Sequence, residues 1–438
     1  MDTPRRFYIH TFGCQMNEAD SSRMGEILQR AGWSRAETAE EAELILLNTC
    51  AVRDKAEQKV LSALGRYRPL KAEHRTLIGV TGCIAQAQKE ALLKKVPYVD
   101  FVVGPDGIPK LAEVVRKVMD ERVRVAETAW MDSEHYLFPR ADPESAQGKV
   151  TEFVTVMKGC DHVCSYCIVP YVRGRELSRP VDEVLEEVRT LARAGVREVT
   201  LLGQNVNSYR GGASFAQLLA KVQEIPEVLR LRFTTSNPHD LPDELVDAFG
   251  AMPKLMPHLH LPVQSGSDRL LEKMRRGHTM AHYYERVDRL RRACPDLALT
   301  TDLIVGFPGE TEEDFAATME LIERARFDNV FSFVYSPRPH TAAAIHEQEW
   351  GHVPHAVKVE RLERLQERAR EISLGFAQAR VGKTVQVLVE GPSKTDPHKR
   401  FGRTPENRVV NFVGESAPGA LVDVHVERVT PNALFGHE

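Results

Sequence analysis

The first 120 residues alternate between short apolar runs and helical stretches, and this alternation constrains the fold more than any other feature. Strand-like runs occur at "RFYIHTFG", "AELILLNT", "TLIGVTG" and "VDFVVG". Helical stretches such as Glu18–Ala31 and Val52–Tyr67 separate them. Strands that alternate with helices form a parallel sheet with helices on both faces. We therefore predict an N-terminal doubly wound parallel sheet.

A second alternating series begins near residue 151. We expect its strands at Phe153–Met157, Glu198–Leu202, Leu229–Thr234, His258–Pro262, Ala298–Val305 and Val330–Tyr335. The clearest helix is Val181–Ala194, which has Pro180 near its start and Gly195 after its end. Six strand–helix units in succession predict a partial or full parallel barrel of the α/β class. A second open Rossmann-like sheet is the alternative.

The remaining segments differ from these two series in their hydrophobic periodicity and charge. Residues 121–150 show weak periodicity and suggest a linker or cover, and "PHAVKVERLERLQERAREISLGFAQARVG" predicts a long charged helix that connects domains. After Val381, short alternating runs separated by turn residues predict a small all-β barrel. The expected domains are therefore 1–120, a linker at 121–150, 151–378 and 379–438.

Composition limits the function classes. No apolar run is long enough to span a membrane and the first residues lack the apolar core of a signal peptide, so we expect a cytoplasmic protein. The net charge of −4 excludes a polycation. Residues 379–412 nevertheless hold seven Lys or Arg against three Asp or Glu, with Phe401 and Phe412 between them. This pattern is typical of a nucleic-acid module, although a solvated basic face on a structural barrel would look the same.

Three of the seven cysteines, Cys160, Cys164 and Cys167, lie together in "GCDHVCSYCIVPYVRGR". The odd cysteine count and low density argue against a disulfide framework. Structural zinc needs a fourth ligand, and His162 is too near in sequence to complete a tetrahedron comfortably. The spacing suits a 4Fe-4S cluster, in which three thiolates leave one iron open to a small chelating molecule. Zinc, or thiols that are merely buried or redox-active, are the alternatives.

Three more cysteines follow the first three N-terminal strands. Cys14, Cys50 and Cys83 each come just after a strand and are preceded by Gly, Thr and Gly. The carboxyl ends of parallel strands meet along one sheet edge. We therefore expect these thiols to converge, with small preceding residues that let the backbone approach whatever is bound. The seventh, Cys294, is expected to be structural.

The loop motif "CDHVCSYC" resembles the signature of the radical S-adenosylmethionine enzymes. That resemblance implies a partial barrel, a 4Fe-4S cluster on Cys160, Cys164 and Cys167, and S-adenosylmethionine chelated by the open iron and cleaved to a 5′-deoxyadenosyl radical. It also suggests cofactor contacts from strand ends and from the cluster loop, namely Tyr166, Gln204, Asn205, Ser236 and Gln264. Asp302, in "TDLIVGFPGET", is either a substrate contact or a buried paired carboxylate. Arg173, Arg175 and Arg179 are expected to form a basic rim that contacts phosphate or forms salt bridges to glutamates of the barrel.

The N-terminal motifs "HTFGCQMNEADSSRM", "NTCAVRDKAEQKV" and "GVTGCIAQ" resemble those of the methylthiotransferase family within this superfamily. The resemblance implies a second 4Fe-4S cluster on Cys14, Cys50 and Cys83 that handles the transferred sulfur, and a C-terminal TRAM domain that binds RNA. All six cysteines would then be catalytic. It further implies two molecules of S-adenosylmethionine per turnover, an electron donor such as a flavodoxin or ferredoxin, and an iron–sulfur or sulfur donor.

Within this family, "GQNVNSY", "SNPHDL", "HLPVQSGSDRLL" and "GRTPENRVVNF" are most similar to the branch that inserts a methylthio group at C2 of N6-isopentenyladenosine next to the anticodon of tRNA. Threonylcarbamoyladenosine in tRNA, or an aspartate of a ribosomal protein, is the alternative substrate. A non-catalytic RNA-binding iron–sulfur redox sensor is the alternative of another class.

Overall fold

The structure is a computed structural model of the 438-residue chain that describes residues 5–51, 54–74, 76–131, 138, 143–234, 236–393 and 396–438. Within the predicted helix Val52–Tyr67, residues 52 and 53 lie outside these ranges. The chain divides into two compact units. The first unit comprises Met1–Ser145, Met157–His162 and Cys167–Arg179, and the second comprises Ala146–Val156, Val163–Tyr166 and Pro180–Glu438. None of the described helices combines the length and apolarity that a membrane span needs.

The first unit contains the predicted doubly wound sheet. Its strand order is β2-β1-β3-β4-β5-β6, and every neighbouring pair is parallel. The strands are β1 (Arg6–Thr11), β2 (Ser34–Arg35), β3 (Leu44–Thr49), β4 (Leu77–Gly82), β5 (Phe101–Val103) and β6 (Val125–Glu127). The helices are α1 (Gln15–Arg30), α2 (Asp54–His74), α3 (Cys83–Gln88), α4 (Glu90–Lys95) and α5 (Leu111–Glu121), with the 3-10 helix η1 (Pro105–Lys110).

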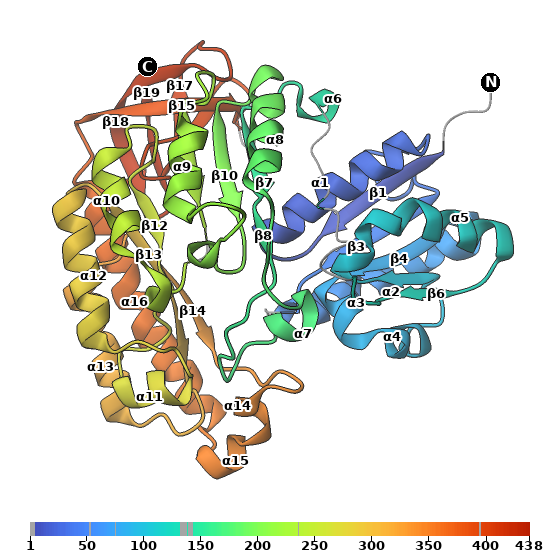
Figure 1. Cartoon of the computed structure of the whole chain (residues 1–438), viewed down its shortest axis with the longest axis horizontal. Coiled ribbons are helices and arrows are strands. Elements are labelled where there is room, and N and C mark those ends of the chain that lie inside the picture. Colours follow the sequence, from blue (N-terminus) through green and yellow to red (C-terminus); the bar gives the residue numbers. More distant parts are fainter. Residues whose placement is uncertain are drawn as a thin grey trace. The chain divides into compact units, whose positions relative to one another are not determined.

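Alternate residues of the central strands point to opposite faces, and each face has its own core. On β3, Ile45 and Leu47 pack with residues of α2, α3 and α4, whereas Leu44 and Leu46 pack with residues of α1 and α5. Strands buried on both faces read as continuous apolar runs, and "LILL" in β3 is such a run. The helices lie on both sides of this sheet (Figure 1).

The predicted linker proved to contain more structure than its weak periodicity indicated. Val125–Glu127 forms β6, which adds to the edge of the sheet beside β5. Pro143–Ala146 forms the short helix α6. The first unit also includes the antiparallel pair β8 (Met157–Lys158) and β9 (Leu177–Ser178), and the helix α7 (Val169–Arg173) between them in sequence. The missed strand has only three residues, too few for an alternating pattern to be visible.

The second unit contains the predicted parallel strands as two three-stranded sheets. One has the order β11-β10-β7 and the other β12-β13-β14, with a parallel bridge from Leu231 in β11 to Leu255 just before β12. The strands are β7 (Thr151–Thr155), β10 (Glu198–Leu202), β11 (Arg230–Phe233), β12 (His258–His260), β13 (Ala298–Val305) and β14 (Asn329–Val334). All pairs are parallel, so this is the partial (β/α) barrel.

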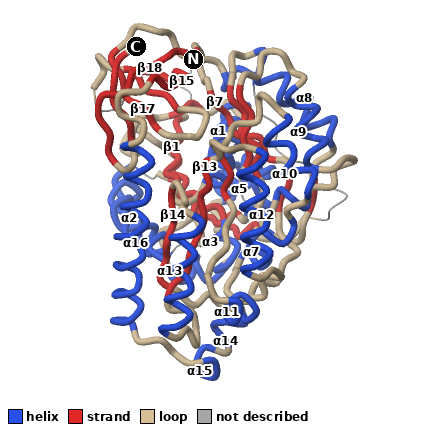
Figure 2. The backbone as a smooth tube through the Cα atoms, turned by 90° about the vertical axis from the view of Figure 1, so that its left-hand side faces the viewer, coloured by secondary structure: helices blue, strands red, loops and turns tan. Residues whose placement is uncertain are grey.

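Helices line the outside of this barrel (Figures 1 and 2). They are α8 (Val181–Arg193), α9 (Phe215–Gln223), α10 (Asp243–Ala251), α11 (Asp268–Lys273), α12 (Met280–Ala293) and α13 (Glu312–Ala325), followed by α14 (Ala342–Ile345) and α15 (Glu347–Trp350). Short 3-10 turns occur at η2 (Val206–Ser208) and η3 (Pro238–Asp240). The predicted connecting helix is α16 (His355–Gln378), which packs against β14.

The C-terminal residues form a closed five-stranded barrel with the order β15-β16-β17-β19-β18. Its strands are β15 (Thr384–Pro392), β16 (Arg400–Arg403), β17 (Val409–Val413), β18 (Leu421–Thr430) and β19 (Ala433–His437). Two buried arginines of β11 bind its β16–β17 turn: Arg230 donates to the Arg403 carbonyl (2.6 Å), and Arg232 donates to the carbonyls of Thr404 (2.9 Å) and Pro405 (2.7 Å). These bonds fix the small barrel at the amino ends of the parallel strands.

Candidate active site

Cys14, Cys50 and Cys83 occupy equivalent places at one edge of the N-terminal sheet. Cys14 is the N-cap of α1 directly after β1, Cys50 follows the last residue of β3, and Cys83 is the first residue of α3 after β4. In the order β2-β1-β3, the chain turns to opposite sides after β1 and after β3, and such a reversal is where doubly wound sheets bind ligands. The placement predicted for these three cysteines is therefore confirmed.

The backbone of neighbouring strand ends approaches closely at this edge, where the sequence analysis assigns the small residues before the thiols to the approach of a bound group. Gly82 has a φ of +86°, and a Cβ on it would lie 2.5 Å from the Thr49 carbonyl oxygen. Only glycine fits this position readily, both because of its left-handed φ and because of the lack of space. The strand end that carries Cys83 therefore lies against the strand end that carries Cys50.

Buried side-chain amides hold Cys14 at the same edge. The Asn17 side chain in α1 donates to Asn48 Oδ1 (3.0 Å) and to the Thr49 carbonyl (3.1 Å), and Asn48 Nδ2 donates to the Asn17 carbonyl (2.7 Å). Both side chains are fully buried. Because buried amides hold such bonds firmly, the start of α1, with Cys14, is fixed against the end of β3.

The thiols of this edge have different electrostatic surroundings. A hydrogen bond with the Cys50 thiol, and then the positive charge of Arg173, lower the pKa of Cys14 to about 6. Burial raises the pKa of the Cys83 thiol, and the Arg173 charge opposes that rise. Arg173 itself is buried, and its Nε donates to Cys83 Sγ (3.4 Å) while its Nη2 pairs with Asp20 Oδ2 (2.7 Å).

The loop trio is held by backbone bonds within each unit. In the first unit, which includes Cys160 and Cys167, the Cys160 amide donates to the Gly174 carbonyl (3.1 Å) and the Val169 amide donates to Cys167 Sγ (3.4 Å). Cys164 belongs to the second unit. There the neighbouring Ser165 amide donates to the Met274 carbonyl (3.0 Å).

Arg276 is a residue of this site that the sequence analysis missed. It is buried, and its Nη1 donates to Cys164 Sγ (3.4 Å) while its Nη2 donates to the Pro262 carbonyl (2.6 Å). Its sequence context, "MRRGH", contains no sign of a thiol partner 112 positions away. Only the folded barrel brings the two residues together.

Four of the five residues predicted to contact the cofactor follow strands of the barrel and the fifth, Tyr166, lies in the cluster loop, but their side chains differ in what they do. Gln204 follows β10 and is half-buried. Asn205 is buried and binds the next strand-end loop, donating to Asp240 Oδ2 (2.6 Å) and accepting from the Asn237 amide (3.1 Å). The buried Ser236 hydroxyl oxygen has no hydrogen-bond partner among the described residues. Tyr166 packs on the cluster that contains Met274 and Phe307.

Gln264 has an unusual backbone. Its φ is +80°, although it is not glycine, and it is buried beside β13, where its amide donates to the Asp302 carbonyl (3.0 Å). Strained backbone of this kind occurs preferentially at ligand sites. The side chain of Asp302 lies 3.5 Å from His260 Nε2 and is partly exposed. The carboxylate of Asp302 is therefore partly exposed beside a histidine that the sequence analysis did not identify, and is not the buried pair that we considered.

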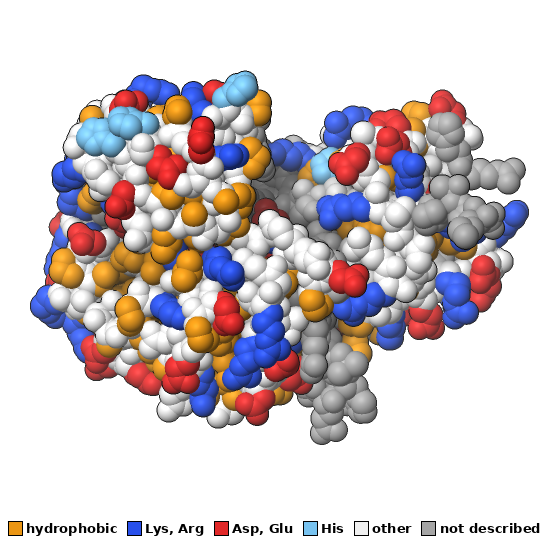
Figure 3. All heavy atoms as spheres, turned by 90° about the horizontal axis from the view of Figure 1, so that it is seen from above, with side chains coloured by type: hydrophobic (Ala, Val, Ile, Leu, Met, Phe, Trp, Pro, Cys, Tyr) orange, Lys and Arg blue, Asp and Glu red, His pale blue; other side chains and the backbone are white. Residues whose placement is uncertain are grey.

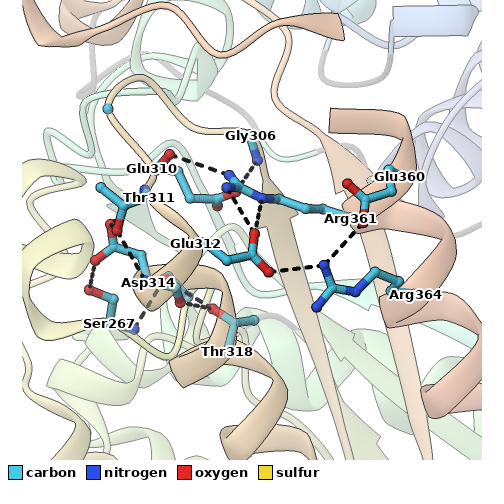
Figure 4. Close-up of polar contacts among 12 residues, drawn as sticks. Ser267, Gly306, Glu310, Thr311, Glu312, Asp314, Thr318, Glu360, Arg361 and Arg364 are labelled. Atoms are coloured by element: carbon cyan, nitrogen blue, oxygen red, sulfur yellow. Dashed lines mark hydrogen bonds and ion pairs between the residues drawn. The ribbon is translucent and has the colours of Figure 1, made fainter. Parts of the chain in front are cut away.

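A buried polar network fixes the loops around Gln264 and the end of β13 (Figure 4). Glu310 accepts from the Gly306 amide (2.8 Å) and pairs with Arg361 of α16 (2.7 Å), and burial raises the pKa of this carboxyl. The Ser267 hydroxyl donates to Asp314 of α13 (2.5 Å). Buried ion pairs and hydrogen bonds of this kind hold loops in one conformation, so this end of the barrel is rigid.

The predicted basic rim is wrong for two of its three arginines. Arg173 is buried against Cys83 and Asp20, and Arg179 is fully buried near the Phe138 ring. Buried guanidinium groups cannot contact phosphate in solution. Of the three, only Arg175 is exposed, and it pairs with Asp161 (2.8 Å). Cys294 lies at the C-cap of α12, where we predicted a helix end.

Most of the basic residues within 379–412 form ion pairs inside the second unit. Arg380, Lys399, Arg403 and Arg408 each pair with a carboxylate, and the two remaining described cations are Lys383 and Arg400. Lys394 lies outside the described residues. Acidic and basic side chains are interspersed over the face that Figure 3 shows. Charge alone therefore gives weaker support for a nucleic-acid module than the sequence count suggested.

Comparison with known proteins adds a second line of evidence. Family models match at residues 6–104 (Uncharacterized protein family UPF0004), 154–322 (Radical SAM superfamily) and 378–437 (TRAM domain). The chain is 61% identical over 434 residues to tRNA-2-methylthio-N(6)-dimethylallyladenosine synthase of Myxococcus xanthus, covering 99% of this chain and 94% of that protein. It is 47% identical to the enzyme of the same name from Syntrophotalea carbinolica, with 99% of each covered. The chain belongs to the tRNA-2-methylthio-N(6)-dimethylallyladenosine synthase family.

Solved structures agree on the fold. The radical S-adenosylmethionine methyltransferase TsrM from Kitasatospora setae superposes with a TM-score of 0.57 at 16% identity, covering 78% of each chain. The cobalamin-dependent S-adenosylmethionine radical enzyme OxsB gives a TM-score of 0.54 at 12% identity, with 84% of this chain and 62% of that chain covered. The predicted radical S-adenosylmethionine barrel and the small C-terminal barrel are thus confirmed.

Membership of the radical S-adenosylmethionine superfamily implies a 4Fe-4S cluster and S-adenosylmethionine, and the thiols present suit such a cluster. In the described part of the chain, no three His, Cys, Asp or Glu side chains are placed to hold a single metal ion. A cubane cluster spreads its ligands farther apart, because each thiolate binds a different iron. Arginine N–H groups directed at Cys83 and Cys164 are the kind of bond that cluster sulfurs accept.

Proposed function

We propose that this chain is a radical enzyme that inserts a methylthio group at C2 of N6-isopentenyladenosine, next to the anticodon of tRNA. The observation that carries the proposal is the full-length similarity to named synthases, at 61% identity for one of them. The six cysteines add chemical support, since they form two sets of three, and each set leaves one position of a four-iron cluster without a protein ligand.

The two sets have different roles in this proposal. Cys160, Cys164 and Cys167 hold the cluster that binds S-adenosylmethionine, and Cys14, Cys50 and Cys83 hold a second cluster. When bound, the first cluster would supply the electron that cleaves one S-adenosylmethionine to the radical that removes hydrogen from C2. The second would supply the site from which sulfur, methylated by a second S-adenosylmethionine, is delivered.

The remaining residues position the cofactor and the RNA. Tyr166 packs on the apolar cluster that contains Met274 and Phe307 and covers the adenine. Ser236, whose buried hydroxyl has no described partner, and Gln264, with its strained backbone, bind the ribose or carboxylate. The TRAM barrel contacts the tRNA, whose loop base can be unstacked and inserted into a pocket. A flavodoxin or ferredoxin supplies electrons, and an iron–sulfur or sulfur donor restores the second cluster.

The test uses purified protein that has been reconstituted anaerobically and reduced. We expect about eight irons per chain from two four-iron clusters, formation of 5′-deoxyadenosine, and a methylthio product on an anticodon stem–loop that carries N6-isopentenyladenosine. The matched substrate is the same stem–loop with threonylcarbamoyladenosine, which we expect to remain unmodified. Product on the threonylcarbamoyl substrate alone would contradict the substrate assignment, and four irons or fewer would contradict the second cluster.

A further inference from the structure

Arg173 has an unusual position for a charged side chain. It is the last residue of α7, six positions after Cys167, and only 6% of it is exposed. Its partner Asp20, on α1, is also largely buried. A guanidinium group removed from water is costly unless its N–H groups are paired, so its contacts indicate why it is there.

The ion pair with Asp20 explains only part of this arrangement. Asp20 accepts from Nη2 (2.7 Å), which leaves Nε directed at Cys83 Sγ (3.4 Å). Cys83 also packs against Ile168 and Val172, so α7 covers its side chain. An arginine that served only to balance Asp20 would not need a sulfur as its second acceptor.

We propose that Arg173 is a positioning residue for the second cluster: its Nε–H binds the Cys83 sulfur, and Asp20 holds its positive charge beside the three thiols. This inference rests on the proposed function, because it assumes that Cys14, Cys50 and Cys83 hold a cluster. Hydrogen bonds to the sulfurs and nearby positive charge stabilise the reduced state of an iron–sulfur cluster. Arg173 therefore makes this cluster easier to reduce by one electron.

The experiment isolates the second cluster in the full-length chain. Replacing Cys160, Cys164 and Cys167 together with Ala leaves one cluster, whose midpoint potential can be measured by electron paramagnetic resonance during a redox titration. Into this parent we introduce Arg173→Gln, Arg173→Lys and the control Arg175→Gln. The control removes the same charge from Arg175, which lies two positions after Arg173 and whose side chain is 89% exposed.

We expect all four proteins to bind about four irons. Arg173→Gln should shift the midpoint to a more negative potential, Arg173→Lys should shift it less because the charge remains, and Arg175→Gln should leave it unchanged. Equal potentials for the parent and Arg173→Gln would overturn the proposal.

If Arg173→Gln does not retain iron, the lysine variant decides the question. It keeps the charge but loses the fixed Nε–H geometry, so a potential equal to that of the parent overturns the proposal and a negative shift supports it. A parent that binds no iron overturns both the second cluster and this inference. If the parent binds iron but no Arg173 variant changes the midpoint potential, this inference alone is overturned.

Discussion

Cys14, Cys50 and Cys83 come from three strand ends spread over 70 residues, whereas Cys160, Cys164 and Cys167 come from one loop of eight residues. The first trio is positioned by the register of a parallel sheet, in which Thr49 pairs with Gly82. The second trio is close in sequence, and its loop is held by a bond from the Cys160 amide to Gly174 and by bonds with the distant residues Met274 and Arg276. Sheet pairing brings the ligands of the first site together, whereas in the second site the sequence brings them together and the rest of the fold holds their loop in place.

Two local features are nevertheless common to the two sites. A glycine with left-handed φ precedes a cysteine in each, Gly82 (+86°) in one and Gly159 (+75°) in the other. In each, a buried arginine donates to one cysteine sulfur at 3.4 Å. These shared features suggest that both sites meet the same requirements, namely a sharp bend before the ligand and a cation beside the sulfur.

The largest effect should separate the two trios by reaction step. We expect Cys160→Ala to abolish 5′-deoxyadenosine formation, because one thiolate of the cluster that binds S-adenosylmethionine is lost. Cys50→Ala should leave 5′-deoxyadenosine formation intact and abolish the methylthio product. Chromatography of both products, with iron analysis, checks the prediction. If Cys50→Ala stopped S-adenosylmethionine cleavage and Cys160→Ala did not, the two roles would have to be exchanged.

The next effect concerns the two glycines. Alanine at a left-handed φ costs about 1–2 kcal/mol, and here it also meets backbone, the Thr49 carbonyl oxygen for Gly82 and the Arg175 carbonyl oxygen for Gly159. We expect each substitution to lower the free energy of unfolding by about 3 kcal/mol or more and to remove the iron of its own site. Chemical denaturation and iron analysis measure both.

Gly148→Ala is the matched control for these variants. Gly148 has a similar φ of +78° with nothing within 4 Å of the added methyl group, so it should cost only about 1–2 kcal/mol. If Gly148→Ala lowered the free energy of unfolding as much as Gly82→Ala, strained φ and not close approach would explain why glycine is needed at the cysteine sites.

A smaller effect is expected at Arg276, the counterpart of Arg173 in the other site. Arg276→Gln removes the N–H bond to Cys164 Sγ. Because loss of such outer-shell partners typically costs 10–100-fold in affinity or activity, we expect S-adenosylmethionine cleavage to slow about tenfold with the iron retained. The control is Arg275→Gln, which removes the same charge from the exposed neighbouring residue. Equal rates for the two variants would argue against a role for the bond to sulfur.

The sequence was sufficient for features that depend on short-range pattern. The longer parallel strands and the convergence of Cys14, Cys50 and Cys83 could be predicted, because parallel sheets place successive strand ends on one edge. The contacts of Arg173 and Arg276 with cysteine sulfurs could not be predicted. Arg173 looked like a basic rim residue because "VRGR" follows the cluster loop, but its burial depends on Asp20, 153 positions earlier.

The same limit applies to the side chains at the strand ends. Asn205 looked like a cofactor ligand, yet both ends of its amide bind the Asn237–Asp240 loop. His260, which lies beside Asp302, gave no signal in the sequence because it has the alternating pattern of any strand residue. Which polar groups at a strand end are engaged by neighbouring loops depends on tertiary contacts, and these have no short-range pattern.

The smallest effect distinguishes thiols within the first trio, in protein stripped of iron. Cys14 is exposed, and its pKa is lowered to about 6, first by the Cys50 thiol and then by Arg173, whereas burial raises the pKa of Cys83. At pH 7 Cys14 is therefore mostly thiolate, the reactive form, and Cys83 is a protonated thiol. Limited alkylation with iodoacetamide, followed by peptide mass spectrometry, should label Cys14 well before Cys83. Labelling of Cys14 should reach a plateau above about pH 7, one unit above its pKa.

Cys294 is the internal reference for this measurement, because partial burial and the negative charge of Asp296 raise its pKa. Its labelling should keep increasing with pH over the range in which that of Cys14 is constant. Parallel pH profiles for the two residues would mean that the thiol pair and Arg173 do not activate Cys14 in the iron-free protein. The arrangement of the sheet would then not by itself set the ionisation of Cys14.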